Sequence, residues 1–114
     1  SDHNPIDIEN KNVEFENGYY GTIGMESLFG SARQKLDIEE IISCLTDKPK
    51  KRFNLPVTAI ETDIKANLTL FDPDKEYVFE KDTILSKSKN SAFLGKSLKG
   101  KIYGIFSNNK LVLN

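Results

Sequence analysis

The fold class is decided by residues 37–56, DIEEIISCLTDKPKKRFNLP. Apolar side chains recur at helical spacing over residues 38–45, and Asp37 followed three residues later by Glu40 has the pattern of a capping box. A second short helix is expected over residues 47–52, because its proline falls in the first turn and its basic residues lie near the negative end of the helix dipole. This stretch therefore predicts two consecutive helices, the first with an apolar stripe.

The chain before this stretch is predicted to change from a loop to a helix. Residues 1–24 carry Gly, Asn and Pro without a steady period, which is typical of an ordered loop. Met25, Leu28 and Phe29 then stand at offsets of three and four, so one face of a helix can pack inward. The pair Gly30-Ser31 is expected to interrupt this helix.

The chain after Pro56 changes from a helical to a strand-like period. Strands are expected at residues 66–71, 76–80, 102–106 and 111–113. The first should end at a turn over residues 72–74, and residues 107–110 should join the last two strands in a hairpin. Residues 87–91 form a polar connection, for which residues 93–95 provide an apolar anchor. Helices in the first half and strands in the second half predict an α+β chain.

Composition and charge limit what the chain can do by itself. Only 38% of its 114 residues are hydrophobic and none is Trp, so we expect part of its apolar surface to be meant for a further segment of a larger protein. The 16 basic and 17 acidic residues are mixed along the sequence and leave a net charge of −1. No long-range field would therefore attract nucleic acid, which is not expected as a partner.

Cysteine, histidine and apolar runs exclude several classes of protein. The single cysteine, Cys44, excludes an internal disulfide, and its place beside an apolar helical stripe predicts a buried side chain. The single histidine, His3, cannot build a His-rich metal centre and is expected to form hydrogen bonds or to pack. No apolar run reaches the roughly 20 residues of a membrane span and no signal peptide is visible. We therefore expect a cytoplasmic protein without a membrane partner.

Four blocks of residues in a fixed order carry a family resemblance. The blocks are Ser-Asp-His-x-Pro at 1–5 with aromatic-Gly-x-x-Gly-apolar-Glu at 20–26, Leu-Thr-x-x-Pro at 45–49 with Phe-Asn-Leu at 53–55, Ala-x-Leu-Thr-Leu-Phe-Asp at 66–72, and Ser-Lys-x-Lys-Asn-Ser-x-Phe-x-Gly at 86–95. Each block alone is weak, but together they cover almost the whole chain. The sequence resembles the C-terminal quarter to third of a dihydroorotase, a zinc-dependent amidohydrolase of pyrimidine biosynthesis.

The resemblance implies a fold for the parent protein and a place for this chain within it. The family fold is an α/β TIM barrel with its active site at the C-terminal ends of the strands, together with a small β-sandwich built from both chain ends. By resemblance, residues 1–55 form the C-terminal end of the barrel, with an active-site loop followed by outer helices. Residues 56–114 would form the C-terminal part of the β-sandwich domain.

The resemblance also implies a chemistry. Dihydroorotases interconvert N-carbamoyl-L-aspartate and dihydroorotate with two zinc ions per intact active site, and those ions are expected to be absent from this chain alone. The carboxylate matching Asp2 binds one zinc and carries the proton that the leaving nitrogen receives, so Asp2 is implied as both a metal ligand and a catalytic residue. Tyr20 and Gly21 match the backbone contact to the substrate ring, where glycine allows a ligand to approach the main chain.

One departure from the family leaves alternatives open. Ile6 stands where the family usually has a histidine that binds the substrate carboxylate, and an apolar side chain cannot replace that donor. The parent is therefore either an active dihydroorotase or a non-catalytic, dihydroorotase-like subunit that partners aspartate carbamoyltransferase. A related cyclic amidohydrolase such as allantoinase is a third interpretation. The expected partners are the small-molecule substrate, the N-terminal remainder of the same protein, and either a second copy or the carbamoyltransferase.

Overall fold

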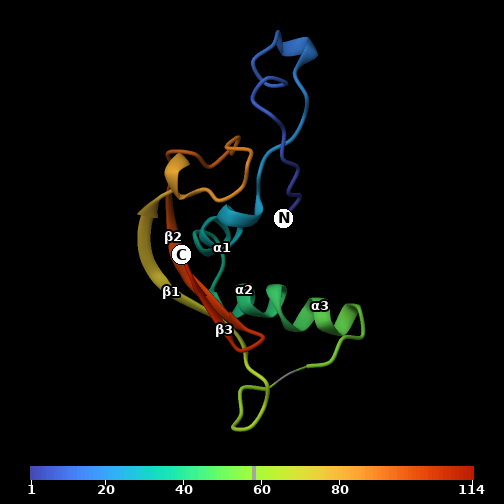
Figure 1. Cartoon of the computed structure of the whole chain (residues 1–114), viewed down its shortest axis with the longest axis vertical. Helices are drawn as coiled ribbons and strands as arrows, with labels where there is room; N and C mark the ends of the chain where they lie inside the picture. Colours follow the sequence, from blue (N-terminus) through green and yellow to red (C-terminus); the bar gives the residue numbers. More distant parts are fainter. Residues whose placement is uncertain (58) are drawn as a thin grey trace.

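Helices occupy the first half of the chain and an antiparallel sheet occupies the second half (Figure 1). The computed structural model describes residues 1–57 and 59–114. Its elements are η1 (Phe15–Asn17), α1 (Met25–Arg33), α2 (Ile38–Leu45), α3 (Asp47–Arg52), β1 (Asn67–Val78), η2 (Lys81–Thr83), β2 (Ser97–Ser107) and β3 (Lys110–Leu113). The predicted α+β class is confirmed for this chain, whereas the barrel and the sandwich of the parent stay predictions.

The sheet is a three-stranded meander in the order β1-β2-β3. Both neighbouring pairs are antiparallel, with Leu68 opposite Phe106 and Ile105 opposite Val112. Asn108 and Asn109 join β2 to β3 with φ angles of 51° and 58°, values that a two-residue type I′ turn requires and that asparagine tolerates. The predicted hairpin at the end of the chain is therefore confirmed.

The turn predicted over residues 72–74 is wrong, because β1 continues through it. The pairing of β1 with β2 shifts register between Asp72 and Glu76, so the extra residues bulge out of one continuous strand. A carboxylate oxygen of Asp72 accepts hydrogen bonds from the backbone amides of Asp74 (2.9 Å) and Lys75 (3.2 Å). Asp72 thus makes inside a bulge the side-chain-to-backbone hydrogen bonds that are typical of a turn. The strands expected at 66–71 and 76–80 are one bent strand, β1.

The interruption predicted at Gly30-Ser31 is also wrong, since α1 continues to Arg33. Gly30 is buried where α1 lies on the sheet, and a Cβ built on it would meet the Tyr77 hydroxyl at 2.6 Å and the Leu98 Cβ at 3.1 Å. Glycine therefore permits a close approach of helix to sheet here. Gly100 on β2 has a comparable place, because a Cβ there would lie 2.8 Å from the Phe29 ring.

The core joins the N-terminal loop to the sheet. Ile23, Phe79, Ile84 and Leu98 form one buried cluster, and Tyr77 and Phe93 pack against it. Phe93 thus confirms part of the apolar anchor predicted at 93–95. Because Ile23 directly precedes α1 in the loop and Leu98 lies on β2, burial of this cluster fixes the loop on the sheet.

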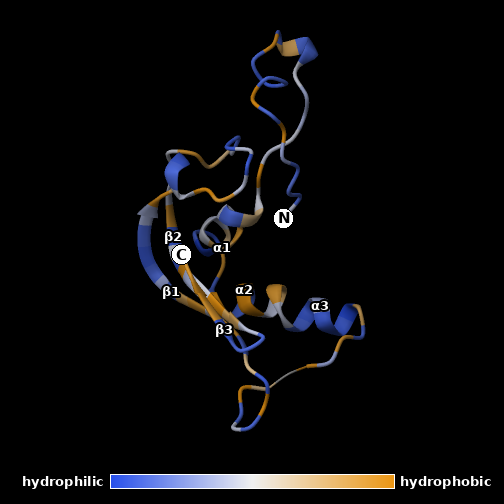
Figure 2. Ribbon diagram, viewed as in Figure 1, coloured by the Kyte–Doolittle hydropathy of each residue, from blue (hydrophilic) through white to orange (hydrophobic). Residues whose placement is uncertain are grey.

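Helices α2 and α3 lead away from the sheet (Figure 1), and hydrophobic residues colour much of α2 and the chain just after α3 (Figure 2). Both predicted helices are confirmed, and Asp37 occupies the N-cap position, but its side chain makes no capping hydrogen bond. Cys44, predicted to be buried, is exposed. Phe53 and Leu55, expected to pack α3 down, are 73% and 55% exposed.

The molecule is elongated, with extents of 56 × 31 × 29 Å. Its radius of gyration of 16.5 Å exceeds the roughly 13 Å typical of a compact domain of this length. Within residues 1–57 and 59–114, no helix is both long enough and apolar enough to cross a bilayer. The extended outline and the open apolar residues agree with the expectation that the chain packs against a further segment.

We expect Gly100→Ala to reduce the free energy of unfolding more than Gly95→Ala. Both glycines have positive φ, 91° and 74°, so each substitution costs about 1–2 kcal/mol of backbone strain. At Gly95 a Cβ would meet nothing within 4 Å, whereas at Gly100 it would overlap the buried Phe29 ring. The overlap should add about 1–3 kcal/mol, measured by urea unfolding of each variant. Equal losses would show that the ring moves aside without cost.

Candidate functional site in the neck of the N-terminal loop

The N-terminal loop projects from one end of the molecule, and its two ends lie side by side at a neck, defined here as residues 1–6 and 20–24 (Figure 1). The backbone amide of Asn4 donates to the Thr22 carbonyl (2.9 Å), and Asn4 Nδ2 donates to the Tyr20 carbonyl (3.3 Å). A Cβ built on Gly24 would lie 2.5 Å from the Ser1 carbonyl oxygen. The neck therefore brings the segment that carries Asp2 beside the segment that carries Tyr20 and Gly21.

Asp2 and Tyr20 both face solvent at the neck. Asp2 is exposed and has a left-handed φ of 47°, a conformation that aspartate adopts more readily than most residues. The Tyr20 side chain is 92% exposed, so any contact that this position makes within the chain is through its main chain. Within residues 1–57 and 59–114, no group of three or more His, Cys, Asp or Glu side chains could hold a metal ion.

His3 caps the first long helix. Its Nδ1 accepts hydrogen bonds from the backbone amides of Gly24 (3.2 Å) and Met25 (3.3 Å), where α1 begins. These amides belong to the turn whose donors have no partner within the helix. The bonds require an unprotonated Nδ1, which assigns the ring proton to Nε2. The prediction that His3 forms hydrogen bonds is confirmed, and its role is to fix the neck to α1.

Ile6 lies directly against Gly21. A Cβ built on Gly21, whose φ is 146°, would lie 2.5 Å from Ile6 Cγ1 and 2.7 Å from the Asn4 carbonyl oxygen. Ile6 stands where the family resemblance expects a histidine that binds the substrate carboxylate. It therefore packs against Gly21, one of the residues predicted to bind the substrate ring. Here the position of Ile6 offers an apolar surface.

Glu26 has no role predicted from the sequence, and it connects α1 to the segment after η2. Its carboxylate accepts hydrogen bonds from the backbone amides of Leu85 (2.8 Å) and Ser86 (2.9 Å) and from the Ser86 hydroxyl. Burial acts to raise the pKa of Glu26, but the bonds from Ser86 and Leu85 and the positive charge of Lys89 outweigh it, so this pKa is lowered. Glu26 therefore remains ionised and stabilises the base of the loop.

Asn90 is the second residue that the sequence did not single out. Its side-chain amide donates to the Gly21 carbonyl (2.8 Å), and its own carbonyl accepts from the Ile23 amide (2.9 Å). A usable signal was present, because Glu26 ends the first block of the resemblance and Ser86 and Asn90 belong to the fourth. Polar residues within such blocks that have no chemical role are candidates for contacts between the blocks.

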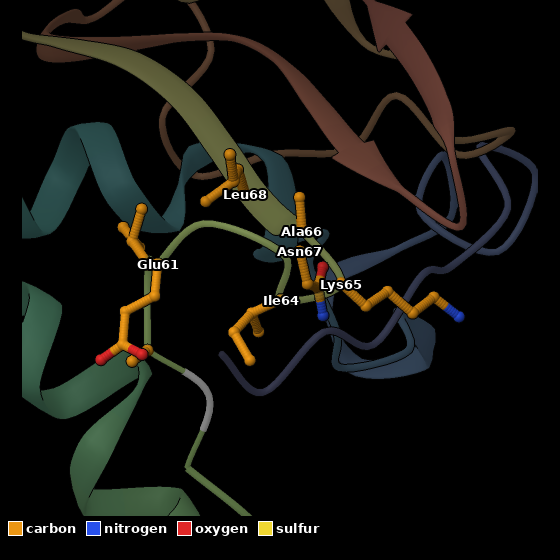
Figure 3. Close-up of a pocket in the computed structure, with 8 residues that line it drawn as sticks. Glu61, Ile64, Lys65, Ala66, Asn67 and Leu68 are labelled. Carbon is orange, nitrogen blue, oxygen red and sulfur yellow. The ribbon is translucent and has the colours of Figure 1, made fainter.

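The described residues line two hollows, one beside the neck and one far from it, and neither is an enclosed substrate pocket. An open groove of about 530 Å³ runs between loop residues 6–9 and segment 87–91. A hollow of about 50 Å³ lies at the opposite end of the molecule, among residues 59–68, where the charged ends of Glu61 and Lys65 point away from one another (Figure 3). It is much smaller than the roughly 300 Å³ that a small-molecule site needs.

Comparison with known proteins finds close similarity to one group of enzymes. No family model matches the chain. A dihydroorotase of Caldicellulosiruptor saccharolyticus is 35% identical over 98% of the chain, one of Bacillus subtilis is 35% identical over 88%, and one of Listeria monocytogenes is 31% identical over 100%. These matches cover 27%, 25% and 28% of the relatives' lengths. The chain thus spans about a quarter of the length of the curated relatives that it matches.

We expect Glu26→Gln to destabilise the chain at neutral pH and to matter less in acid. A depressed pKa in the folded state contributes stability that is present above the unfolded value and lost as the pH falls through the folded value. The difference in unfolding free energy from the parent sequence, about 1–3 kcal/mol, should therefore be largest above pH 4.5 and shrink below it. Urea unfolding at several pH values measures it, with the exposed Glu39→Gln as the matched control. A difference that does not depend on pH would contradict this role.

Proposed function

The chain belongs to the dihydroorotase family, and we propose that it forms the C-terminal portion of an enzyme that interconverts N-carbamoyl-L-aspartate and dihydroorotate. The observation that carries the proposal is the neck, where hydrogen bonds from Asn4 bring the segment of Asp2 beside Tyr20 and Gly21. A carboxylate that moves a proton and a backbone that binds the substrate must lie close together for this reaction. Similarity to dihydroorotases along 98% of the chain supports the same interpretation.

In this proposal Asp2 is the proton carrier. Opening a cyclic amide requires a proton to leave the attacking oxygen and to reach the nitrogen that departs, and closing the ring requires the reverse transfer, from the attacking nitrogen to the oxygen that departs. Asp2 is exposed at the neck, so its carboxylate is open to a substrate on that side. Gly21 contributes its main chain, since a side chain there would collide with Ile6.

The zinc pair implied by the family does not fit the residues of this chain alone. A zinc site needs three or four protein ligands, and the described residues contain no such cluster. His3 already directs Nδ1 to the start of α1. We therefore propose that Asp2 contributes one ligand and that the remaining ligands come from the N-terminal remainder of the protein.

The same remainder is the proposed partner for the open apolar surface. We propose that residues 1–55 complete the amidohydrolase barrel and that residues 56–114 complete its β-sandwich. Exposed apolar side chains support both parts of this arrangement. The proposed barrel part exposes Phe53 and Leu55 after α3, and the proposed sandwich part exposes Leu111, Val112 and Leu113 on β3. A cytoplasmic location belongs to the same proposal.

A non-catalytic role is the second candidate, and Ile6 is the observation that favours it. Ile6 packs on Gly21, so the proposed substrate contact has an apolar neighbour in place of a donor for the substrate carboxylate. In that case the parent would serve as a structural subunit beside aspartate carbamoyltransferase or a second copy of itself. A cyclic amidohydrolase acting on a substrate without that carboxylate, such as an allantoinase, would tolerate Ile6 as well.

In the intact protein, we expect Asp2→Ala to lower the rate of dihydroorotate formation by at least about 10²–10⁴-fold, because proton transfer is lost. The rate is measured from the ring closure of N-carbamoyl-L-aspartate. Asp82→Ala, an exposed carboxylate in η2, is the matched control and should keep the parent rate. An active parent whose Asp2→Ala variant keeps most of its rate would overturn the assignment. A parent without activity would favour the non-catalytic role.

The 114-residue chain by itself is expected neither to bind two zinc ions nor to turn over N-carbamoyl-L-aspartate. One carboxylate cannot replace the three or four ligands that each ion needs. Elemental analysis after dialysis against zinc, together with the activity assay, measures both properties. Two equivalents of zinc with turnover would contradict the proposed division of the site between two segments.

A further inference from the structure

The segment after η2 binds three consecutive residues of the neck through Asn90. Asn90 Nδ2 donates to the Gly21 carbonyl (2.8 Å), and the Asn90 carbonyl accepts from the Ile23 amide (2.9 Å). The Thr22 hydroxyl lies 3.3 Å from the same Asn90 carbonyl and accepts from the Ala92 amide (3.1 Å). Together these bonds form a clamp, defined here as Asn90, Thr22 and the backbone groups that they contact.

A buried residue strengthens the same contact. The hydroxyl of Ser88, which is only 9% exposed, donates to the Ile6 carbonyl (2.8 Å). The backbone amide of Asn90 lies 3.4 Å from that hydroxyl oxygen. Both sides of the neck are therefore bonded to one short segment more than 60 residues away in sequence. Losing one partner would leave a half-buried polar group unpaired.

The clamp fixes the orientation of one peptide group of the neck, and Asn4 fixes the peptide group before it. In a trans peptide the carbonyl and the following amide point in opposite directions. The Tyr20 carbonyl accepts from Asn4 Nδ2, so the Gly21 amide points away from Asn4. The Gly21 carbonyl accepts from Asn90, so the Thr22 amide points away from Asn90. The Gly21 and Thr22 amides thus have fixed orientations at the position of the proposed substrate contact, the first set by Asn4 and the second by Asn90.

We propose that Asn90 is a positioning residue that orients the Gly21–Thr22 peptide group, and with it the Thr22 amide, for a substrate that carries a hydrogen-bond acceptor, such as a ring carbonyl. This inference rests on the proposed function, because it assigns an orientation to the same contact. It adds that this peptide group would contact the substrate through its amide donor, since the Gly21 carbonyl already has a partner within the chain. Asn90 acts through Gly21 and does not itself touch the substrate.

The test compares Asn90→Asp with Asn108→Asp in the intact protein. Both variants add one negative charge at an asparagine, but Asn108 is exposed at the β2–β3 turn. Asn90→Asp replaces the Nδ2 donor by an oxygen that repels the Gly21 carbonyl. We expect KM for dihydroorotate to rise about tenfold with a smaller change in kcat, because one hydrogen bond that orients the binding backbone is lost. Asn108→Asp should leave both constants unchanged.

Two further measurements keep the test decisive. Thr22→Val removes the hydroxyl bonds to Asn90 and Ala92 without changing the charge, so it should also raise KM even if Asn90→Asp fails to fold. Hydrogen exchange of the Ile23 amide, which donates to Asn90, should become faster in Asn90→Asp and stay unchanged in Asn108→Asp.

The outcomes separate this inference from the proposed function. If the parent is active and neither Asn90→Asp nor Thr22→Val changes KM, the positioning role is overturned while the proposed function stands. If the parent has no dihydroorotase activity, the proposed function fails and the positioning role fails with it. The hydrogen exchange rate of the Ile23 amide then tests only whether the clamp exists. Faster exchange of Ile23 in Asn90→Asp only would then support the clamp, and unchanged exchange would reject it.

Discussion

The hydrogen bond from the Ile23 amide to the Asn90 carbonyl is the contact on which the arrangement of this chain depends. It joins a loop without regular structure to a segment between two strands, and it does so next to a buried cluster that contains Ile23 itself. Apolar burial supplies most of the free energy there, but burial has no direction. The hydrogen bonds of Asn90 and Glu26 add direction, because each requires one orientation of the neck and of the start of α1.

The elements that could be predicted from the sequence are those determined by neighbouring residues. The helices at 38–45 and 47–52 and the final hairpin follow from spacing, proline placement and turn residues, and all three are confirmed. The errors arise where a distant segment decides the outcome. Gly30 does not end α1 because the sheet lies against it, and Asp72 does not end β1 because β2 continues to pair on both sides of the bulge.

The residues of the candidate site also fall into two groups, those named from the sequence and those found only in the structure. Asp2, Tyr20 and Gly21 could be named from the resemblance, because a family motif identifies residues that carry chemistry. The blocks of the resemblance mark Glu26, Ser88 and Asn90 only as candidates for contacts, because their partners lie about 60 or more residues away in sequence and only the fold shows which groups they bind. Cys44 was predicted to be buried because it stands beside an apolar stripe, but it is exposed on α2.

Gly21 shows why a glycine in a motif is weak support for substrate binding by itself. The packing of Ile6 and Asn4 excludes a Cβ at this position whether or not a ligand ever approaches. The stronger argument is the direction of the backbone, since Asn4 binds the Tyr20 carbonyl, Asn90 binds the Gly21 carbonyl, and both peptide groups are thereby fixed in orientation. Ile6 then restricts the recognition that remains. A substrate that lies on this neck, as proposed, would meet the main chain at Gly21 and an apolar side chain, so the partner for a substrate carboxylate would have to come from outside the neck.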